Sequence, residues 1–256
     1  MKISKNMERW SPLILLLAFL VLWQLVVMLF RIPAFIFPSP TQIASQFVEF
    51  GGPLLEAAWK TFWVTMLGFA IAIVVGVLLG FLIGSSRLAY TALYPLMIGF
   101  NAVPKAAVVP ILVVWFGIGI GPGILTAFLI SFFPITVNIA TGLATLEPEL
   151  EDVLRVLGAK RWDVLVKVGL PRSMPYFYGS LKIAITLAFV GTVLAEMTAG
   201  DSGIGYLMQT AGSQQRMPLA FAGLVTIGAM AMAMYELFSW VEKRTTGWAH
   251  RSTHGE

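Results

Sequence analysis

The feature that most constrains this chain is the length of its segments without a charged side chain. No Asp, Glu, Lys or Arg occurs in the 21 residues between Arg9 and Arg31, the 26 between Lys60 and Arg87, or the 41 between Lys105 and Glu147. A helix needs about 20 apolar residues to cross a bilayer, so the longest segment holds most of two crossings. With 58% hydrophobic residues, 12% charged residues and a mean hydropathy of +0.84, the composition indicates an integral membrane protein.

The pattern predicts an all-α, polytopic membrane protein in which residues 1–256 form a single transmembrane domain. Its six expected crossings cover residues 12–30, 61–84, 88–116, 120–143, 178–199 and 217–241. The glycine-rich segment 117–123 is the expected turn between the third and the fourth. An even number of crossings places both termini on one side of the membrane.

The distribution of basic residues identifies that side. Thirteen Lys and Arg residues lie before the first crossing, after the second, between Arg155 and Lys182, and after the sixth, whereas the opposite side has only Arg31, Arg216 and the boundary residue Lys60. Loops rich in Lys and Arg stay in the cytoplasm, which places both termini and the polar loop 145–177 there. The net charge of +4 therefore reflects topology and does not indicate binding to nucleic acid.

The loop 145–177 has the pattern of an amphipathic helix outside the bilayer. Apolar side chains recur on one helix face at Leu150, Val153, Leu154 and Leu157. Gly158 can end this helix, and a second short helix is expected over residues 162–169, stopped by Pro171 and Pro175. So short a helix is marginal alone, so its apolar stripe lies either on the membrane surface or against a partner protein.

The spacing within this loop is more specific than its amphipathic pattern. Asp152, Val153 and Leu154 are followed by three residues, Gly158, nine residues, and then Val168, Leu170 and Pro171. This order resembles the EAA signature of permease subunits in binding-protein-dependent ABC importers, which reads Glu-Ala-Ala, three residues, Gly, nine residues, Ile-x-Leu-Pro. Asp152 is one methylene shorter than Glu, and Val153 and Leu154 are bulkier than Ala. The resemblance implies a coupling helix from Glu151 to Gly158, seated in a groove of the ATPase subunit.

Further motifs are dispersed through the chain. They are Phe37, Pro38, Ser39 and Pro40; Pro104, Lys105, Pro110, Trp115, Phe116, Gly117 and Gly119; and Ala195, Glu196 and Met197 with Gly203, Ile204, Gly205 and Tyr206. Together they resemble the taurine, alkanesulfonate, nitrate and bicarbonate branch of these permeases, and also some thiamine-precursor permeases. The resemblance implies a type I importer of a bacterial inner membrane, assembled from two copies of this chain, two ATPase subunits and a periplasmic solute-binding protein. The solute would be a small anion or a vitamin precursor.

The residue types present argue against chemistry on this chain itself. No G-x-x-x-x-G-K-[ST] phosphate-binding loop occurs, so ATP and Mg²⁺ are expected on a separate ATPase and the chain is not expected to be an enzyme. The chain has no cysteine, and its two histidines, His250 and His254, lie in a polar tail, so neither a metal site nor a cofactor is expected.

Two other classes of membrane protein share single features with this chain. Gly200, Asp201, Ser202 and Gly203 match the G-x-S-G motif of rhomboid-type intramembrane proteases, but the last crossing has no histidine to act as the base. An ion-coupled secondary carrier would need membrane-embedded carboxylates and matching repeats, and only Glu196 clearly qualifies.

Charged and polar residues inside the crossings are the candidates for the solute pathway. Asn101, Lys105 and Glu196 are the residues singled out, because charges within a bilayer usually mark function. At about 1.5 Å per helical residue, Lys105 and Glu196 lie at similar depths. They are expected either to pair and fasten two helices, or to leave Lys105 facing the pathway, where it would attract an anion.

Two further expectations concern packing and the outer surface. Gly76, Gly80 and Gly84 form overlapping G-x-x-x-G steps, which allow close helix approach either within one subunit or between two copies. The segment 31–60 is a candidate platform for the binding protein, and the segment 199–217 is expected to cap or gate the pathway from outside.

Overall fold

The computed structural model describes residues 5–144, 156–158 and 160–246, and in this part of the chain all regular structure is helical. In chain order the elements are α1 (Lys5–Leu29), α2 (Pro40–Glu49), α3 (Gly51–Gly84), α4 (Arg87–Ala102), a 3₁₀ turn (Lys105–Val108), α5 (Val109–Phe116), α6 (Ile120–Ala144), α8 (Arg161–Val164), a π-helical turn (Leu165–Gly169), α9 (Leu170–Ala199), α10 (Ile204–Ser213) and α11 (Met217–Thr245).

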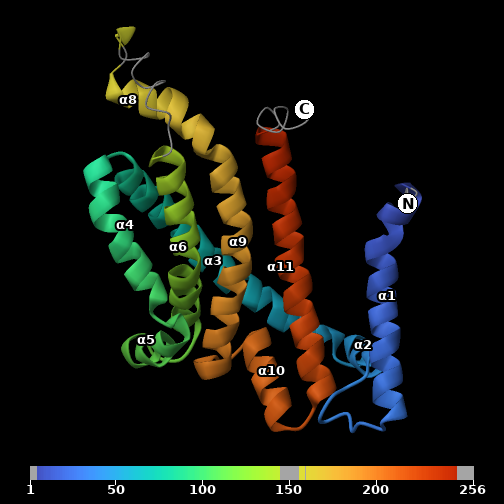
Figure 1. Ribbon diagram of the computed structural model, residues 1–256. Coiled ribbons are helices and arrows are strands. Elements are labelled where there is room, and N and C mark those ends of the chain that lie inside the picture. The colour runs from blue at the N-terminus through green and yellow to red at the C-terminus, as the bar shows by residue number, and fades with distance from the viewer. Residues whose placement is uncertain (1–4, 145–155, 159, 247–256) are drawn as a thin grey trace.

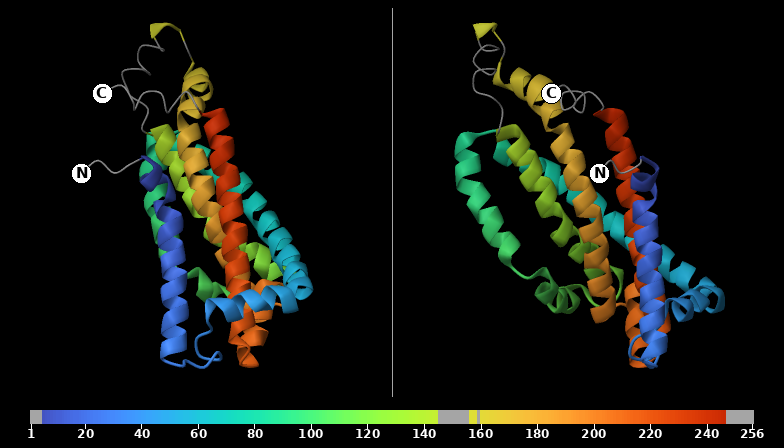
Figure 2. Two further views of the ribbon diagram at one scale, coloured as in Figure 1. Left: turned by 90° about the vertical axis from the view of Figure 1, so that its right-hand side faces the viewer. Right: turned by 45° about the vertical axis from the view of Figure 1, so that its right-hand side comes forward.

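Five helices are long and apolar enough to cross a membrane, and the bent unit formed by α4, the 3₁₀ turn and α5 brings the crossings to six if it is counted as one. In Figures 1 and 2, α1 begins, α6 ends, α8 begins and α11 ends at the same end of the bundle, whereas α2, α5 and α10 lie at the other. Following the distribution of basic residues, we name these the cytoplasmic end and the outer end.

The third crossing is not the continuous helix expected over residues 88–116. α4 ends at Ala102, and the chain bends by 73° before it enters the 3₁₀ turn and α5. Val103 is extended, with φ −66° and ψ 125°. It precedes Pro104, whose ring disfavours helical geometry in the residue before it. As a result α5 lies across the outer end of the bundle (Figure 1).

The closest packing in the bundle joins α3 to α6. Small residues recur every four positions on the face of α3 that meets α6, namely Gly68, Ala72, Gly76, Gly80 and Gly84. A Cβ atom on Gly76 would lie 2.9 Å from Ile135, and one on Gly80 would lie 2.8 Å from the carbonyl oxygen of Thr136. The two backbones can therefore approach only because these side chains are missing. The G-x-x-x-G steps pack within one chain, which decides between the two expected locations.

α9 packs on the other side of α6 and completes the core. Phe189 and Ile185 of α9 are fully buried, as is Ile135 of α6. Gly191 lies so close to α6 that a Cβ there would come within 2.8 Å of the carbonyl oxygen of Thr126. α3, α6 and α9 therefore form one tightly packed unit, against which α10 and α11 are placed.

The helix expected over residues 162–169 does not stop at the two prolines. α8, the π-helical turn and α9 follow one another directly, so helical structure runs from Arg161 to Ala199. Pro171 lies in the first turn of α9, where a missing N–H is tolerated, and Pro175 lies inside the helix. The expectation of a separate short helix is therefore wrong, and the cytoplasmic segment is structurally continuous with a crossing.

α1 lies apart from the rest of the bundle (Figures 1 and 2), and only 6% of its most apolar window is buried. Its described contacts lie near the outer end. Trp23 stacks on Phe37 with ring centroids 5.2 Å apart, and the Gln24 side chain accepts a hydrogen bond from Thr41 at 3.3 Å. So apolar a surface requires lipid or another membrane helix around it.

The segment 31–60, expected to lie outside the membrane, is largely helical. Ser39 caps α2 reciprocally with Gln42, and α3 already begins at Gly51. α2 lies at the outer end in Figure 1, so the segment remains on the side expected for a binding-protein platform.

Candidate functional site

The predicted coupling helix is described only at its end, because Leu150, Glu151, Asp152, Val153 and Leu154 lie outside the described residues. Val156 and Leu157 are 87% and 77% exposed. Gly158 has φ +87°, in the left-handed region that favours glycine and that commonly ends an α-helix. The conformation of Gly158 agrees with its predicted role as the end of the helix.

The residues after Gly158 are held by local bonds. The backbone N–H of Lys160 donates to the Asp163 carboxylate at 3.3 Å, and the Lys167 ammonium lies 3.2 Å from the same carboxylate. Val164 is buried, and Ser173 at the start of α9 sits against Gly142 of α6. A Cβ on Gly142 would lie 3.0 Å from that of Ser173. The segment is therefore fixed to both α6 and α9.

The other three residues of the signature sit where this segment enters α9. Val168 is half-buried in the π-helical turn, Leu170 is 37% exposed and Pro171 is exposed. α8 and the π-helical turn lead directly into α9, a helix that runs the length of the bundle (Figure 1).

Lys105 and Asn101 lie together at the bend between α4 and α5. The Lys105 ammonium donates to the Asn101 side-chain oxygen at 2.6 Å and also to its backbone carbonyl. It lies 6.0 Å from the ring centroid of Phe133 of α6. The bend thus places a cation at the end of α4, a helix that has no buried residue.

Glu196 has different partners. The Thr61 hydroxyl lies 2.9 Å from both of its carboxylate oxygens, and the backbone N–H of Gly205 donates to one of them at 2.8 Å. Only 7% of Glu196 is exposed. Among the described residues, Lys105 and Glu196 do not form the ion pair that their similar depths allowed. Rise per residue fixes depth and not the side of the helix on which a residue lies.

The threonines around Glu196 were not predicted from the sequence. Thr61, Thr65 and Thr192 are fully buried, and the hydroxyls of Thr65 and Thr192 lie 2.9 Å apart. The signal available in the sequence was that Thr61 and Thr65 are one helical turn apart and therefore lie on the same face of α3. Threonines in membrane helices usually bond their own backbone, which gives this pattern little weight in a sequence.

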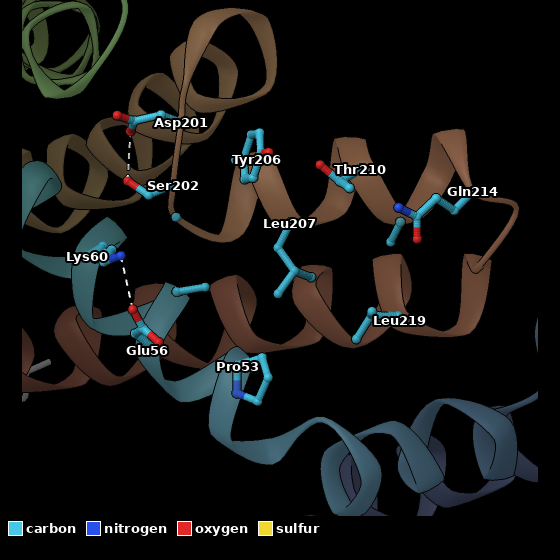
Figure 3. A pocket seen from close by; sticks show the side chains of 13 residues that line it. Pro53, Glu56, Lys60, Asp201, Ser202, Tyr206, Leu207, Thr210, Gln214 and Leu219 are labelled. Atoms are coloured by element: carbon cyan, nitrogen blue, oxygen red, sulfur yellow. Dashed lines mark hydrogen bonds and ion pairs between the residues drawn. The ribbon is translucent and has the colours of Figure 1, made fainter.

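An open groove of about 320 Å³ lies at the outer end, between the start of α3, α10 and the start of α11 (Figure 3). Its polar lining residues are Glu56, Lys60, Asp201, Ser202, Tyr206, Thr210 and Gln214. The Lys60 ammonium lies 3.0 Å from the Glu56 carboxylate, and the Ser202 hydroxyl bonds Asp201 at 2.9 Å. The groove is therefore mostly apolar, with a few polar side chains, among which Lys60 is paired with Glu56 and, within the described residues, Asp201 bonds only a hydroxyl.

An ion pair near the cytoplasmic end, also missed from the sequence, joins α9 to α11. The Lys182 ammonium lies 2.7 Å from the Glu242 carboxylate, with 19% and 11% of the two side chains exposed. Lys182 also lies over the ring of Tyr235.

We expect Lys182→Met to destabilise the protein by about 3 kcal/mol, because it leaves the Glu242 carboxylate buried without a cation. The midpoint of thermal unfolding in detergent measures this. The double variant Lys182→Met with Glu242→Gln should recover much of the loss, because no buried charge remains. An unchanged midpoint for Lys182→Met would show that the pair contributes nothing.

Comparison with known proteins identifies the family of this chain. Residues 72–247 match the family described as binding-protein-dependent transport system inner membrane component. The chain belongs to this family. This permease is 31% identical to a probable ABC transporter permease protein of Haemophilus influenzae, over 91% of its own length and 96% of that protein. It is 32% identical to the riboflavin transport system permease protein RibX of Chloroflexus aurantiacus, over 91% and 88%.

A solved structure shows the same fold. The permease superimposes on a chain of the MetNI methionine ABC transporter in an inward-facing form, with a TM-score of 0.64, 18% identity, and coverage of 75% of this chain and 96% of that one. Other relatives, 26% to 33% identical, are named as permeases for formylaminopyrimidine, aliphatic sulfonates and nitrate. The resemblance drawn from the motifs is confirmed, and the chain is a transport subunit rather than an enzyme.

Proposed function

We propose that this permease moves a small solute, delivered by a periplasmic binding protein, into the cytoplasm, driven by ATP hydrolysis on a separate ATPase subunit. The observation that carries the proposal is the exposed end of the predicted coupling helix. Val156 and Leu157 are apolar and exposed beside a left-handed Gly158, at the end of the bundle where α1 begins and α11 ends. An exposed apolar helix end, three residues before a helical segment that continues into a crossing, suits a docking surface for an ATPase subunit.

The position of this segment favours a protein partner over the membrane surface. In Figure 1, α8 lies beyond the cytoplasmic ends of α6 and α11. A helix bound at the lipid interface would instead lie level with the ends of the crossings. The proposed partner is one of two ATPase subunits, which would bind ATP and Mg²⁺.

The proposed assembly contains two copies of this permease in a bacterial inner membrane. The exposed apolar surfaces of α1, α4 and α5 support this, because some of them can be covered by a second copy and the rest by lipid. The proposed solute is a small anion, such as a sulfonate, nitrate or bicarbonate, or a vitamin precursor. The relatives are named for solutes of both classes.

The proposal is tested by uptake into proteoliposomes that hold the permease with the ATPase that purifies with it. ATP is enclosed in the lumen, which corresponds to the cytoplasm, and the candidate binding protein is added outside with labelled solutes of both classes. We expect uptake of one class that requires both ATP and the binding protein. Uptake driven by a proton or sodium gradient without ATP would instead establish a secondary carrier.

If the solute is an anion, Lys105→Met is expected to slow its uptake about tenfold, because one charge-assisted hydrogen bond in the pathway is lost. Lys105→Arg, which keeps the positive charge, is the matched control. Uptake rates over a range of solute concentrations measure the effect. Unchanged kinetics for the Met variant would remove Lys105 from the pathway and leave it only the bond to Asn101.

A further inference from the structure

α10 is a helix whose first turn is capped by other helices. The residue before it, Gly203, has no side chain that could accept from the free N–H groups at the start of the helix. The N–H of Ile204 instead donates to the Thr61 hydroxyl oxygen of α3 at 2.8 Å, and the N–H of Gly205 donates to the Glu196 carboxylate of α9 at 2.8 Å. Thr61 and Glu196 are themselves bonded, so three helices meet at one pair of side chains.

The fit at this point is close enough to fix the position of α10. Gly203 has φ +94°, and a Cβ on it would overlap the Glu196 carboxylate, while one on Gly205 would lie 2.7 Å from the Cβ of Glu196. A carboxylate at the start of a helix is also favoured by the helix dipole. Both bonds are buried, so water does not compete for them.

The same cluster links α3 to α9 directly. The Thr65 hydroxyl lies 2.7 Å from the carbonyl oxygen of Thr61 and 2.9 Å from the Thr192 hydroxyl. Thr65 makes no bond to α10, so it belongs to the α3–α9 contact alone. Thr61 and Glu196 extend that contact to α10.

α10 forms one wall of the outer groove, and the start of α3 forms another (Figure 3). Tyr206, Thr210 and Gln214 line the groove from α10 and its end, opposite Glu56 and Lys60 of α3. Any shift of α10 relative to α3 therefore changes the width of the groove.

We propose that Thr61 and Glu196 are positioning residues for transport, which tie α10 to α3 and α9 so that the three helices move together and the outer groove keeps its width as they move. This inference rests on the proposed function, because the movement is the one that the ATPase would drive. Without the two bonds, α10 would stay attached to the chain but would no longer follow α3 and α9.

Matched variants separate the α10 contact from general packing. Thr61→Val removes the hydroxyl that accepts from Ile204, whereas Thr61→Ser keeps it. Thr65→Val removes an equally buried hydroxyl one turn away that does not touch α10. Glu196→Met is a second disrupting variant of similar size, without an oxygen to accept from Gly205, which preserves the test if Thr61→Val does not fold.

The position of α10 relative to α3 is read from the distance between spin labels at Leu55→Cys on α3 and Ser213→Cys on α10. Both positions are exposed and outside the groove lining. The chain has no cysteine of its own, so it carries labels only at these positions. The distance is measured in the complex with the ATPase that purifies with the permease, without nucleotide and with ATP, together with uptake by the unlabelled variants.

We expect one narrow distance distribution, the same with and without ATP, when Thr61 is unaltered, and also in Thr61→Ser and Thr65→Val. In Thr61→Val and Glu196→Met the distribution should broaden or shift, and uptake should fall about tenfold, while the ATPase still purifies with the permease. An unchanged distance distribution and unchanged uptake in both disrupting variants would overturn the inference, as would a distance that changes with ATP when both residues are unaltered. Absence of ATP-dependent uptake by the unaltered permease would instead count against the proposed function.

Discussion

Gly80→Leu is expected to leave little folded protein. A Cβ at this position would lie 2.8 Å from the Thr136 carbonyl oxygen, which belongs to the backbone of α6 and cannot turn aside. A leucine would therefore separate α3 from α6 along the tightest contact of the bundle. Such overpacking costs about 3 kcal/mol, a large share of the stability of a typical protein. The measurement is the amount of monodisperse protein recovered by size-exclusion chromatography in mild detergent.

Gly179→Leu in α9 is the matched control, because nothing lies within 4 Å of a Cβ added there. It should be recovered in nearly normal amount. Equal recovery of both variants would contradict the account of the α3–α6 contact, since it would mean that the glycines are not required for the approach of the helices.

Gly158→Val is expected to abolish most uptake while the crossings remain intact. Gly158 has φ +87°, and a β-branched residue is a strong outlier in that region, so the end of the predicted coupling helix would have to rearrange. No described residue lies within 4 Å of a Cβ at Gly158, so the expected effect comes from the backbone conformation. We expect more than about a tenfold loss of uptake, equivalent to about 1.4 kcal/mol or more at the docking surface.

Gly158→Asn provides the control, because asparagine tolerates the left-handed conformation better than other residues with a side chain. Its uptake should be close to that of the unaltered permease. The uptake rates of the two variants are compared at equal amounts of protein in the membrane. If Val and Asn behaved alike, the conformation of Gly158 would have no part in coupling.

The crossings could be predicted from the sequence because the bilayer imposes a minimum length on apolar segments, and charged residues mark the ends of those segments. The bend at Val103 and Pro104 could not be read in the same way, because the segments on both sides are apolar enough to be taken as one crossing. The prolines of the cytoplasmic segment led to the opposite error, because they predicted the end of a helix that in the structure continues. Pro171 falls in a first turn, where it is tolerated, and only the structure shows where that turn begins.

The coupling surface stays a prediction, which rests on residues that are close in the sequence and keep a fixed spacing. The cap of α10 could not be predicted, since Thr61 and Glu196 are 135 residues apart and neither is unusual in its own helix. Similar depth suggested that Lys105 and Glu196 would pair, but depth says nothing about the direction in which a residue points. Contacts between distant helices depend on how the helices turn about their axes, which the local pattern does not fix.

The central claim is that residues ending at Gly158 dock an ATPase, and purification from the native membrane in mild detergent tests it most directly. The unaltered permease is compared with Leu157→Glu, which places a charge on the predicted apolar stripe, and with Val156→Glu, an equally exposed neighbour outside that stripe. Mass spectrometry of the purified material should find an ATPase with a phosphate-binding loop in the unaltered and Val156→Glu samples, and not in Leu157→Glu. An ATPase retained in full by Leu157→Glu would contradict the proposed docking surface. Its absence from the unaltered sample, under conditions that keep other membrane complexes together, would contradict the assembly itself.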